Sequence, residues 1–365
     1  MTGKKILFVL PRMGGGGAER VTALVSNALA QRGNDVTIYT LVGGDSFYPL
    51  DHKVNYKSLG ITVDRSSKLK LLWSEATSFG GAFFSIRKLI KKEKFDIVVS
   101  LLVETDILVA LCKLSGLNFN HVCSERNDPT KRSKMLLRII NAIYKRAKLF
   151  ICQSKMVADF YTAVPDEIKT VIPNPVEPKN LPARDKVTPN RIVAVGRLSE
   201  QKNFTMLINS ISAVRKIFPD AYLDIYGEGP MREQLQKQIN DLNLANCVTL
   251  CGAKGNVQEL IADAELFVMS SDYEGFPNAL LEAVAIGIPV ISTAFPTGVA
   301  YELIGDDNGL IVPVDDADAM SDAIRKMLSD KARLAVMSDN NRESAKKYYT
   351  ENVIKMWEDE LSNIL

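Results

Sequence analysis

The sequence is poor in the residues that build metal fingers, disulfide frameworks and membrane spans. Its 365 residues include 2 histidines, 2 tryptophans and 5 cysteines. The cysteines lie singly, with no zinc-finger spacing, at positions 112, 123, 152, 247 and 251. We therefore expect reduced thiols in a cytosolic chain. No apolar run approaches the ~20 residues of a spanning helix, and residues 6–10 are too short for a signal peptide, so any membrane contact should be peripheral.

Charge is nearly balanced over the whole chain but not along it. The formal net charge is +2. Residues 1–180 hold 27 Lys and Arg against 16 Asp and Glu, whereas residues 181–365 hold 18 against 27. This asymmetry indicates an anionic partner for the first half, either nucleic acid or a membrane surface. Because no nucleic-acid-binding motif is present, we expect no nucleic acid and favour an anionic membrane.

The chain opens with a buried strand over residues 4–10, a glycine-rich turn and an amphipathic helix that ends near Gly33. This order lets the backbone approach a phosphate. Gly15 and Gly17 fit the first two positions of a dinucleotide fingerprint, but Arg20 occupies the third. No Lys-Ser or Lys-Thr follows, which excludes a P-loop.

Two later segments of the first half are strongly basic. In residues 66–94, lysines and an arginine alternate with Trp73 and several phenylalanines. This pattern fits an interfacial helix on anionic lipid, or an ordinary helix with a solvated lysine face. For residues 131–148 we favour the solvated helix face. Between them, the strand ending at Ser124 leads into a polar cluster, residues 124–129, where ligands of open α/β sheets bind.

Five prolines between residues 173 and 189 mark a linker, after which the strand–loop–helix pattern restarts. The strand at residues 191–195 is followed by Arg197 and Lys202, two cations placed where they could neutralise a diphosphate. Either one could equally be a solvated surface residue.

The most informative stretch runs from Glu274 to Glu282. It follows a strand-like run at residues 266–269, and a helix should open near Pro277 and end at Gly287. The helix amides favour an anion. Eight helical residues span about 12 Å, too far for the two carboxylates to share a proton, so each should accept a hydroxyl at one end of an elongated ligand. The alternative is a surface helix with two solvated glutamates.

This stretch, Glu followed by seven residues and Glu with Gly-Phe-Pro-Asn inside, resembles the signature of glycosyltransferase family 4. Residues 196–203, Gly-Arg-Leu-x-x-Gln-Lys-Asn, resemble a second motif of that family. The resemblance implies the α/β GT-B fold: two Rossmann-like domains facing across a cleft, with a C-terminal helix crossing back. We expect domains at residues 1–175 and 191–348, a linker at 176–190, and the returning helix at 349–365.

The resemblance also implies roles for individual residues. Glu274 would contact the transferred sugar and Glu282 the ribose, while Arg197 and Lys202 would contact the donor phosphates. Glu125 is the best match for a donor-facing position, although a histidine common in the family is missing there, and Arg126 or Asn127 is a candidate for acceptor contact. The remaining donor-binding candidates are Gly14, Gly15, Gly16, Gly17, Asn174, Gly196, Gly227, Gly229, Phe276, Pro277, Asn278 and Ala279.

By the same resemblance we expect a retaining, metal-independent hexosyltransferase without a cofactor. It would move a sugar from a nucleotide-sugar donor, with UDP favoured, to a glycan acceptor linked to a polyprenyl diphosphate. It would work in bacterial surface polysaccharide or glycan assembly, as a peripheral protein on the cytoplasmic face of the plasma membrane. The alternatives are a nucleotide-sugar 2-epimerase of the same fold and a non-catalytic scaffold that binds a nucleotide sugar. The sequence fixes neither the sugar, the acceptor linkage nor the oligomeric state.

Overall fold

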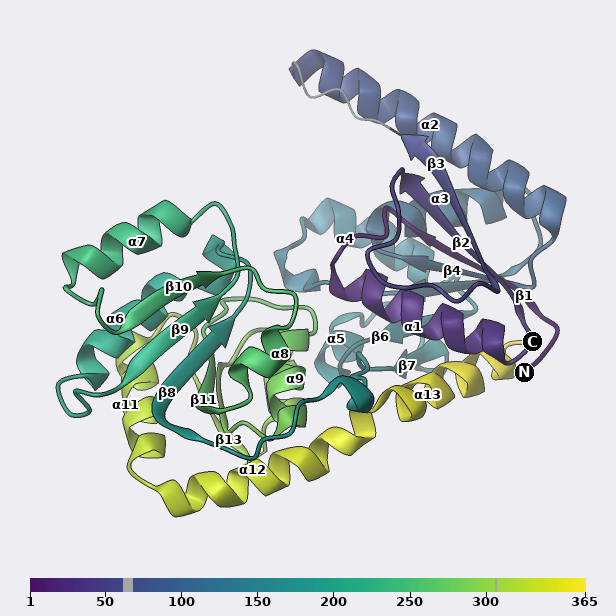
Figure 1. Cartoon of the computed structure of the whole chain (residues 1–365). Coiled ribbons are helices and arrows are strands. Elements are labelled where there is room, and N and C mark those ends of the chain that lie inside the picture. The colour runs from purple at the N-terminus through teal and green to yellow at the C-terminus, as the bar shows by residue number, and fades with distance from the viewer. Residues whose placement is uncertain (62–67, 306) are drawn as a thin grey trace. The chain divides into compact units, whose positions relative to one another are not determined.

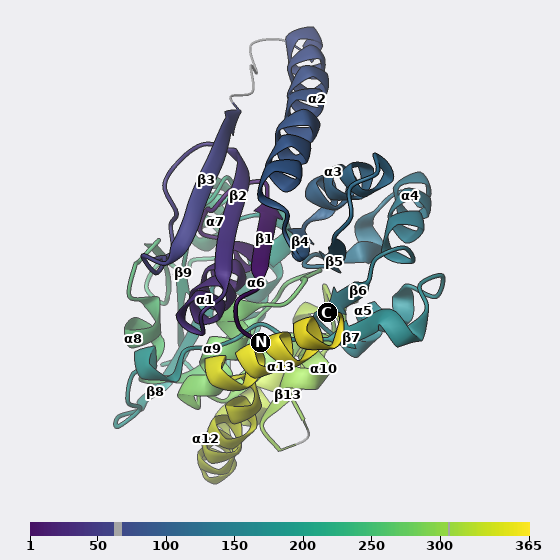
Figure 2. The same cartoon turned by 90° about the vertical axis from the view of Figure 1, so that its right-hand side faces the viewer.

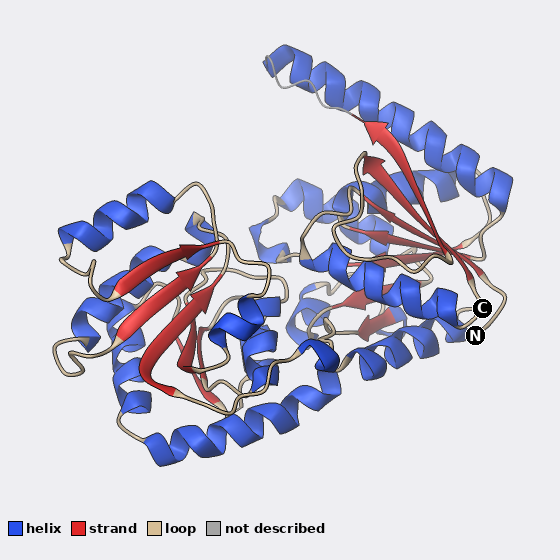
Figure 3. Cartoon of the chain, in the orientation of Figure 1, coloured by secondary structure: helices blue, strands red, loops and turns tan. Residues whose placement is uncertain are grey.

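The computed structural model describes residues 1–61, 68–305 and 307–365, and of residues 68–78 the helical backbone alone. The chain forms two compact units, Met1–Pro175 with Thr350–Leu365, and Val176–Tyr349. Each unit is a parallel sheet with helices on both faces (Figures 1 and 3). Both are therefore Rossmann-like α/β units.

The sheet of the first unit has seven strands in the order β3-β2-β1-β4-β5-β6-β7, with every neighbouring pair parallel. Its central strands are continuous apolar runs because helices cover both faces. The strands are β1 (Lys5–Leu10), β2 (Asp35–Val42), β3 (Val54–Ile61), β4 (Ile97–Leu101), β5 (Asn120–Ser124), β6 (Leu149–Cys152) and β7 (Lys169–Val171).

The helices of this unit divide between the two faces of the sheet (Figure 2). α1 (Gly17–Gln31) and the C-terminal α13 (Thr350–Asn363) pack together on one face, where Trp357 is fully buried. The other face carries α2 (Lys68–Glu93), α3 (Val103–Leu114), α4 (Lys134–Tyr144) and α5 (Lys155–Phe160). The last helix thus belongs to the first unit although it follows the second in sequence.

The second sheet has six parallel strands in the order β10-β9-β8-β11-β12-β13. They are β8 (Thr188–Val195), β9 (Tyr222–Tyr226), β10 (Val248–Gly252), β11 (Ala264–Met269), β12 (Val290–Thr293) and β13 (Gly309–Val312). One face is covered by α6 (Phe204–Val214), α7 (Arg232–Asp241) and α11 (Ala317–Leu328), and the other by α8 (Val257–Ile261), α9 (Asn278–Ile286) and α10 (Val299–Leu303). α12 (Lys331–Ala345) packs against α9.

The two strand orders determine where ligands are expected. In the first sheet the order reverses between β1 and β4, and in the second between β8 and β11. Open α/β sheets bind ligands beyond the carboxyl ends of the strands at such a switch point. The loop after β1 holds Gly14 to Gly17, and the loops after β8 and β11 hold Lys202 and Glu274.

Two expected boundaries differ from the structure. Residues 176–190, predicted to be a linker, belong to the second unit, because Arg184 Nη1 donates to the carbonyls of Ala262 and Ala264, each at 2.6 Å. The basic helix expected over residues 131–148 is shorter, because α4 runs only from Lys134 to Tyr144. Ser133 is its N-cap, and the Ser133 side chain accepts a hydrogen bond from the Leu136 amide. Of the basic segment 66–94, residues 66 and 67 and the side chains of 68–78, including Trp73, lie outside the described residues. In the described part of the chain, no helix is both long and apolar enough to cross a bilayer.

Candidate active site

Several hydrogen bonds join the loop that follows β8, which holds Lys202, to the loop that follows β11, which holds Glu274, 72 residues later in the sequence. β8 and β11 are neighbours, so their carboxyl-terminal loops meet. Ser270 Oγ donates to the Lys202 carbonyl at 2.7 Å, and the Asp272 amide donates to the Gln201 carbonyl at 2.9 Å. Asn203 Nδ2 donates to Asp272 Oδ1 at 2.8 Å. Asn203 adopts the left-handed conformation, φ 43°, and its side chain caps α6 at Met206. These contacts fix the backbone on which the candidate residues stand.

Lys202 and Glu274 form an ion pair at this junction. Lys202 Nζ lies 2.5 Å from Glu274 Oε1, and the side chains are 15% and 9% exposed. Gln201 Nε2 donates to the Tyr273 carbonyl at 2.8 Å and lies 3.4 Å from Glu274 Oε2. The structure therefore brings together two residues that the sequence analysis placed in the site on separate motifs. Because the pair is partly buried, the Lys202 ammonium is held in one position, where it can also donate a charge-assisted hydrogen bond to a bound anion.

Glycines allow the neighbouring loops to pack closely. A Cβ on Gly196 would lie 2.9 Å from Lys202 Cε, one on Gly227 would lie 1.8 Å from the Gly196 carbonyl oxygen, and one on Gly229 would lie 2.3 Å from the Leu198 carbonyl oxygen. Gly227 also has φ +148°, which side chains rarely adopt. These three glycines were predicted to contact the nucleotide. The structure gives them a role within the protein, because they hold the β9–α7 loop against the loop that carries Lys202.

α9 begins at Asn278. Pro277, which was expected in the first helical turn, is instead the N-cap residue that precedes it. The helix amides of that turn point toward the loop that carries Glu274, as amides at any helix start do. Glu282 is 8% exposed and Glu274 is 7% exposed, so neither is a solvated surface glutamate. Phe276 packs in the core against Tyr348, with ring centroids 6.2 Å apart, which leaves its backbone rather than its ring for ligand contact.

Arg197, in contrast, is exposed at the carboxyl end of β8. Within the described part of the chain its guanidinium forms no ion pair, so its charge is available to a ligand. Together, Arg197, Lys202 and the α9 amides offer positive charge to a diphosphate. The arrangement can stabilise a diphosphate leaving group and hold hydroxyls on buried carboxylates.

In the first unit, the glycine-rich loop connects β1 to α1. Gly16 is the N-cap and α1 starts at Gly17. The segment after β2 holds this loop in place, since the Phe47 amide donates to the Met13 carbonyl at 2.9 Å and Tyr48 Oη donates to the Gly15 carbonyl at 3.1 Å. No side chain caps the N-terminus of this 15-residue helix, and the Glu19 carboxylate of its first turn lies against Gly16. Phosphate contact by Gly14 to Gly17 stays a prediction.

Glu125 is buried and its carboxylate is engaged by protein groups. Its side chain is 1% exposed and is paired with Arg132, whose Nη2 lies 2.7 Å from Oε1. The amides of Arg126 and Asn127 donate to the same oxygen at 3.0 Å each, and Tyr161 Oη donates to Oε2 at 2.6 Å. The carboxylate thus orders the loop that follows β5. This geometry argues against the catalytic role predicted for Glu125.

Replacing Glu125 with alanine should lower the free energy of unfolding by about 3–5 kcal/mol, because Arg132 would be left buried without its partner. The exposed pair of Glu228 and Arg232 provides a matched control, and Glu228→Ala should cost at most about 1 kcal/mol. Urea unfolding of both variants measures this. Lost transfer with unchanged stability in Glu125→Ala would restore the catalytic role.

Arg126 and Asn174, the other first-unit candidates, lie next to each other. Arg126 is 6% exposed, donates from Nη1 to Asn174 Oδ1 at 3.2 Å, and stacks over Trp357 of α13 at 5.4 Å. Gln153 Nε2 also donates to Asn174 Oδ1, at 2.8 Å. Burial lowers the pKa of Arg126 to about 10, so it remains charged at neutral pH. Both residues therefore lie in a buried polar layer beyond the ends of β5, β6 and β7.

A buried polar chain continues from Glu125 into the core. Tyr144 Oη lies 3.4 Å from Glu125 Oε2 and donates to Asp106 Oδ2 at 2.9 Å, while Ser100 Oγ lies 2.6 Å from Asp106 Oδ1 and 2.8 Å from His121 Nε2. The donor atoms of Asp106, His121 and Cys123 lie within 4.8 Å of one another. Because Ser100 and Tyr144 already satisfy Asp106 and His121, we interpret the cluster as a hydrogen-bonded network rather than a metal site.

The raised pKa of Asp106 should make the free energy of unfolding depend on pH. Burial raises the pKa of this carboxyl well above its ordinary value of 3.8, and Glu125 adds to the rise. Its stabilising contribution is therefore complete at low pH and is lost as pH rises toward the folded-state pKa. Relative to the parent, Asp106→Asn should gain about 1.4 kcal/mol per pH unit above about pH 4 until Asp106 ionises. A constant difference between the two unfolding curves from pH 4 to 7 would contradict this.

Sequence reasoning missed one residue at the first switch point. Leu102, directly after β4, has φ +77° and ψ 149°, a strained conformation for leucine. Thr105 Oγ1 donates to the Leu101 carbonyl at 2.6 Å and stabilises the turn. Such strain concentrates at functional sites, so this turn joins the glycine-rich loop as a site candidate. No sequence signal marks it, because leucine rarely adopts this conformation.

Two Rossmann-like units, with a lysine–glutamate pair beside a helix N-terminus at the second switch point, define a GT-B glycosyltransferase. Two family models match consecutive parts of the chain: Glycosyltransferase Family 4 over residues 15–180 and Glycosyl transferases group 1 over residues 178–344. The chain belongs to glycosyltransferase family 4.

Relatives and solved structures agree with this assignment. The chain is 26% identical to a Campylobacter jejuni alpha-1,4-N-acetyl-D-galactosaminyltransferase named for an undecaprenol-diphosphate-linked glycan, over 97% of each chain. It is 23% identical to the amylovoran biosynthesis glycosyltransferase AmsD of Erwinia amylovora, over 95% of this chain and 96% of that one. The fold is similar to that of Anabaena HepE in complex with UDP, with a TM-score of 0.80, 19% identity and coverage of 98% and 100%.

Proposed function

We propose that this enzyme transfers a sugar from a UDP-sugar, with retention of configuration and without a metal ion, to a glycan linked to a polyprenyl diphosphate. The Lys202–Glu274 pair beside the start of α9 carries the proposal, because it supplies a fixed cation where a diphosphate leaving group needs one. The undecaprenol-diphosphate-linked glycan of the Campylobacter relative supports this acceptor, and the UDP bound to Anabaena HepE supports this donor.

In this mechanism the bond between the anomeric carbon and the diphosphate oxygen breaks, and negative charge develops on the leaving UDP. Lys202, Arg197 and the first-turn amides of α9 stabilise that charge. The acceptor oxygen attacks from the same face, and its proton passes to the departing phosphate. Glu274 is already engaged by Lys202 and Gln201, so we assign it to holding the sugar rather than to attacking it.

A product assay tests this proposal. The protein is incubated with UDP-, GDP- and ADP-sugars, with and without a polyprenyl-diphosphate glycan, and the products are followed by NMR. We expect transfer from a UDP-sugar, the donor's anomeric configuration in the product, and no loss of rate in EDTA. Inverted product or loss of rate in EDTA would contradict the proposed mechanism. Interconversion of donor without acceptor would indicate an epimerase.

We also propose that the enzyme works on the cytoplasmic face of the plasma membrane. The lipid-linked acceptor and the excess of lysine and arginine in residues 1–180 support this location.

A further inference from the structure

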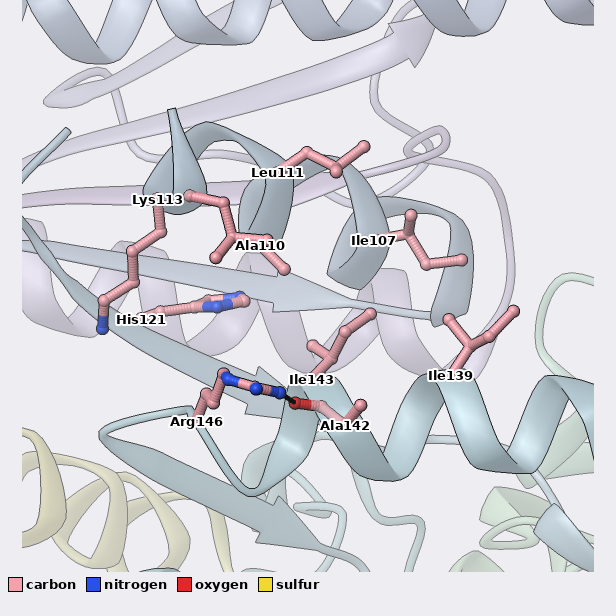
Figure 4. Close-up of a pocket in the computed structure, with 10 residues that line it drawn as sticks. Ile107, Ala110, Leu111, Lys113, His121, Ile139, Ala142, Ile143 and Arg146 are labelled. Carbon is pink, nitrogen blue, oxygen red and sulfur yellow. Dashed lines mark hydrogen bonds between the residues drawn. The ribbon is translucent and has the colours of Figure 1, made fainter. Parts of the chain in front are cut away.

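An apolar groove lies on the first unit, between α3 and α4. Its volume is about 400 Å³, within the range of about 300–1,000 Å³ typical of small-molecule pockets. Figure 4 shows isoleucine and leucine side chains of the two helices along the groove, with Lys113 and Arg146 toward one end. Several of the side chains are unusually exposed for their type: Leu111 is 39% and Ile139 is 45% exposed.

The apolar surface is widely exposed. Leu114, which lines the groove at the end of α3, is 74% exposed, and Met135, one helical turn before Ile139 on α4, is 73% exposed. Exposed apolar side chains that are contiguous with a pocket mark a surface that binds another apolar body. A single exposed leucine would need no explanation, but this set shares one face of two adjacent helices.

The charged residues around the groove indicate the charge of the ligand that would bind there. Lys113 and Arg146 line one end and Lys148 lies near Lys113, and among the described residues none of the three takes part in an ion pair. Arg146, two residues past the end of α4, donates from Nη1 to the Ala142 carbonyl of that helix at 2.8 Å. Burial and the nearby Lys148 lower the pKa of Lys113. His121, which lines the groove, is neutral because burial and Lys113 lower its pKa to about 3. The groove is thus apolar and uncharged along its length and cationic at one end.

We propose that this groove binds an acyl chain of an anionic membrane phospholipid, with the phosphate held between Lys113 and Arg146. This inference rests on the proposed function, since a lipid-linked acceptor requires the enzyme to reach a membrane. The cationic end lies near the start of β5 and β6, whereas the site loops follow the ends of the strands. The diphosphate of the acceptor must reach the site loops, so the groove suits a second, anchoring lipid rather than the acceptor.

Vesicle flotation with the full chain tests the groove. The parent protein should float with phosphatidylglycerol vesicles and bind phosphatidylcholine vesicles at least about tenfold more weakly. Leu114→Glu/Ile139→Glu should lower binding at least about tenfold, and Lys113→Glu/Arg146→Glu should abolish the preference for the anionic lipid. Matched controls on the second unit are Ile217→Glu, at a side chain 60% exposed, and Lys216→Glu, and both should bind like the parent.

Photocrosslinking locates the lipid. Phosphatidylglycerol with a diazirine in its acyl chain should label peptides from residues 103–114 and 134–146. Labelling confined to other segments, or equal flotation of all variants, would overturn the inference. Dimerisation of the parent that Ile139→Glu abolishes, measured by light scattering, would assign the groove to a second copy and also overturn it.

The outcome is separable from that of the proposed function. Groove variants should still transfer sugar to a water-soluble acceptor analogue, because none of the changed residues lies at the site. Sugar transfer by a protein that binds no vesicles would refute the groove and leave the function standing. Specific lipid labelling of a protein without transferase activity would refute the proposed function and leave the lipid-binding groove standing.

Discussion

Replacing Lys202 with alanine is expected to lower the rate of sugar transfer by about 10²–10³-fold while both units stay folded. The change removes the cation next to the developing charge of the leaving diphosphate, and loss of one such stabilising group costs about 2.7–4 kcal/mol of the barrier. Steady-state transfer rates measure the loss, and circular dichroism checks the fold. Glu274→Ala should also abolish transfer, because its carboxylate holds Lys202 and, in our proposal, the sugar.

The same unit contains a matched control. Lys331 Nζ lies 2.6 Å from Glu265 Oε2, and the Glu265 side chain is only 6% exposed. Lys331→Ala therefore also breaks a lysine–glutamate pair and leaves a buried carboxylate, but Glu265 lies at the amino-terminal end of β11, whereas the candidate site follows the carboxyl-terminal end. It should lower stability without lowering the transfer rate by more than about twofold. Near-normal transfer by Lys202→Ala would rule out the proposed site.

The largest effect on stability is expected from Gly227→Ala. The new Cβ would meet the Gly196 carbonyl oxygen at 1.8 Å, and the backbone at φ +148° is itself unfavourable for alanine. Backbone cannot move aside cheaply here, since the Gly227 amide donates to the Gly252 carbonyl at 3.0 Å and the Gly196 amide donates to the Tyr226 carbonyl at 2.9 Å. We expect a loss of more than about 4 kcal/mol, or a second unit that does not fold.

Gly255→Ala provides the comparison. A Cβ there meets nothing within 4 Å, and its φ is not positive, so stability should change by less than about 1 kcal/mol. Thermal unfolding of the two variants gives the contrast. If both melt at the temperature of the parent, the two glycine loops are not packed against each other as described.

Strands with continuous apolar runs were predictable from sequence. The strands expected at residues 4–10, 191–195 and 266–269 are β1, β8 and β11, and each ends at the expected residue. β3 and β13, each at the edge of its sheet, were not expected from sequence. In β3 only Val54 is buried and polar residues interrupt the apolar ones, while β13 is four residues long and begins with glycine, so neither shows a long apolar run.

The candidate site was predictable only in part. The family motifs identified Lys202 and Glu274, but their contact depends on β8 and β11 being neighbours, which the order of strands along the chain does not reveal. Glu125 was assigned to the donor because it follows a strand end. Its pairing with Arg132, seven residues later, depends on how the loop folds back, and no local pattern encodes that.

A crystal structure of the protein soaked with UDP tests the central claim most directly. Our account predicts the diphosphate within hydrogen-bonding distance of Lys202 Nζ and the first-turn amides of α9, with the ribose hydroxyls on Glu282. A nucleotide bound anywhere else, with Lys202 and Glu282 untouched, would contradict it.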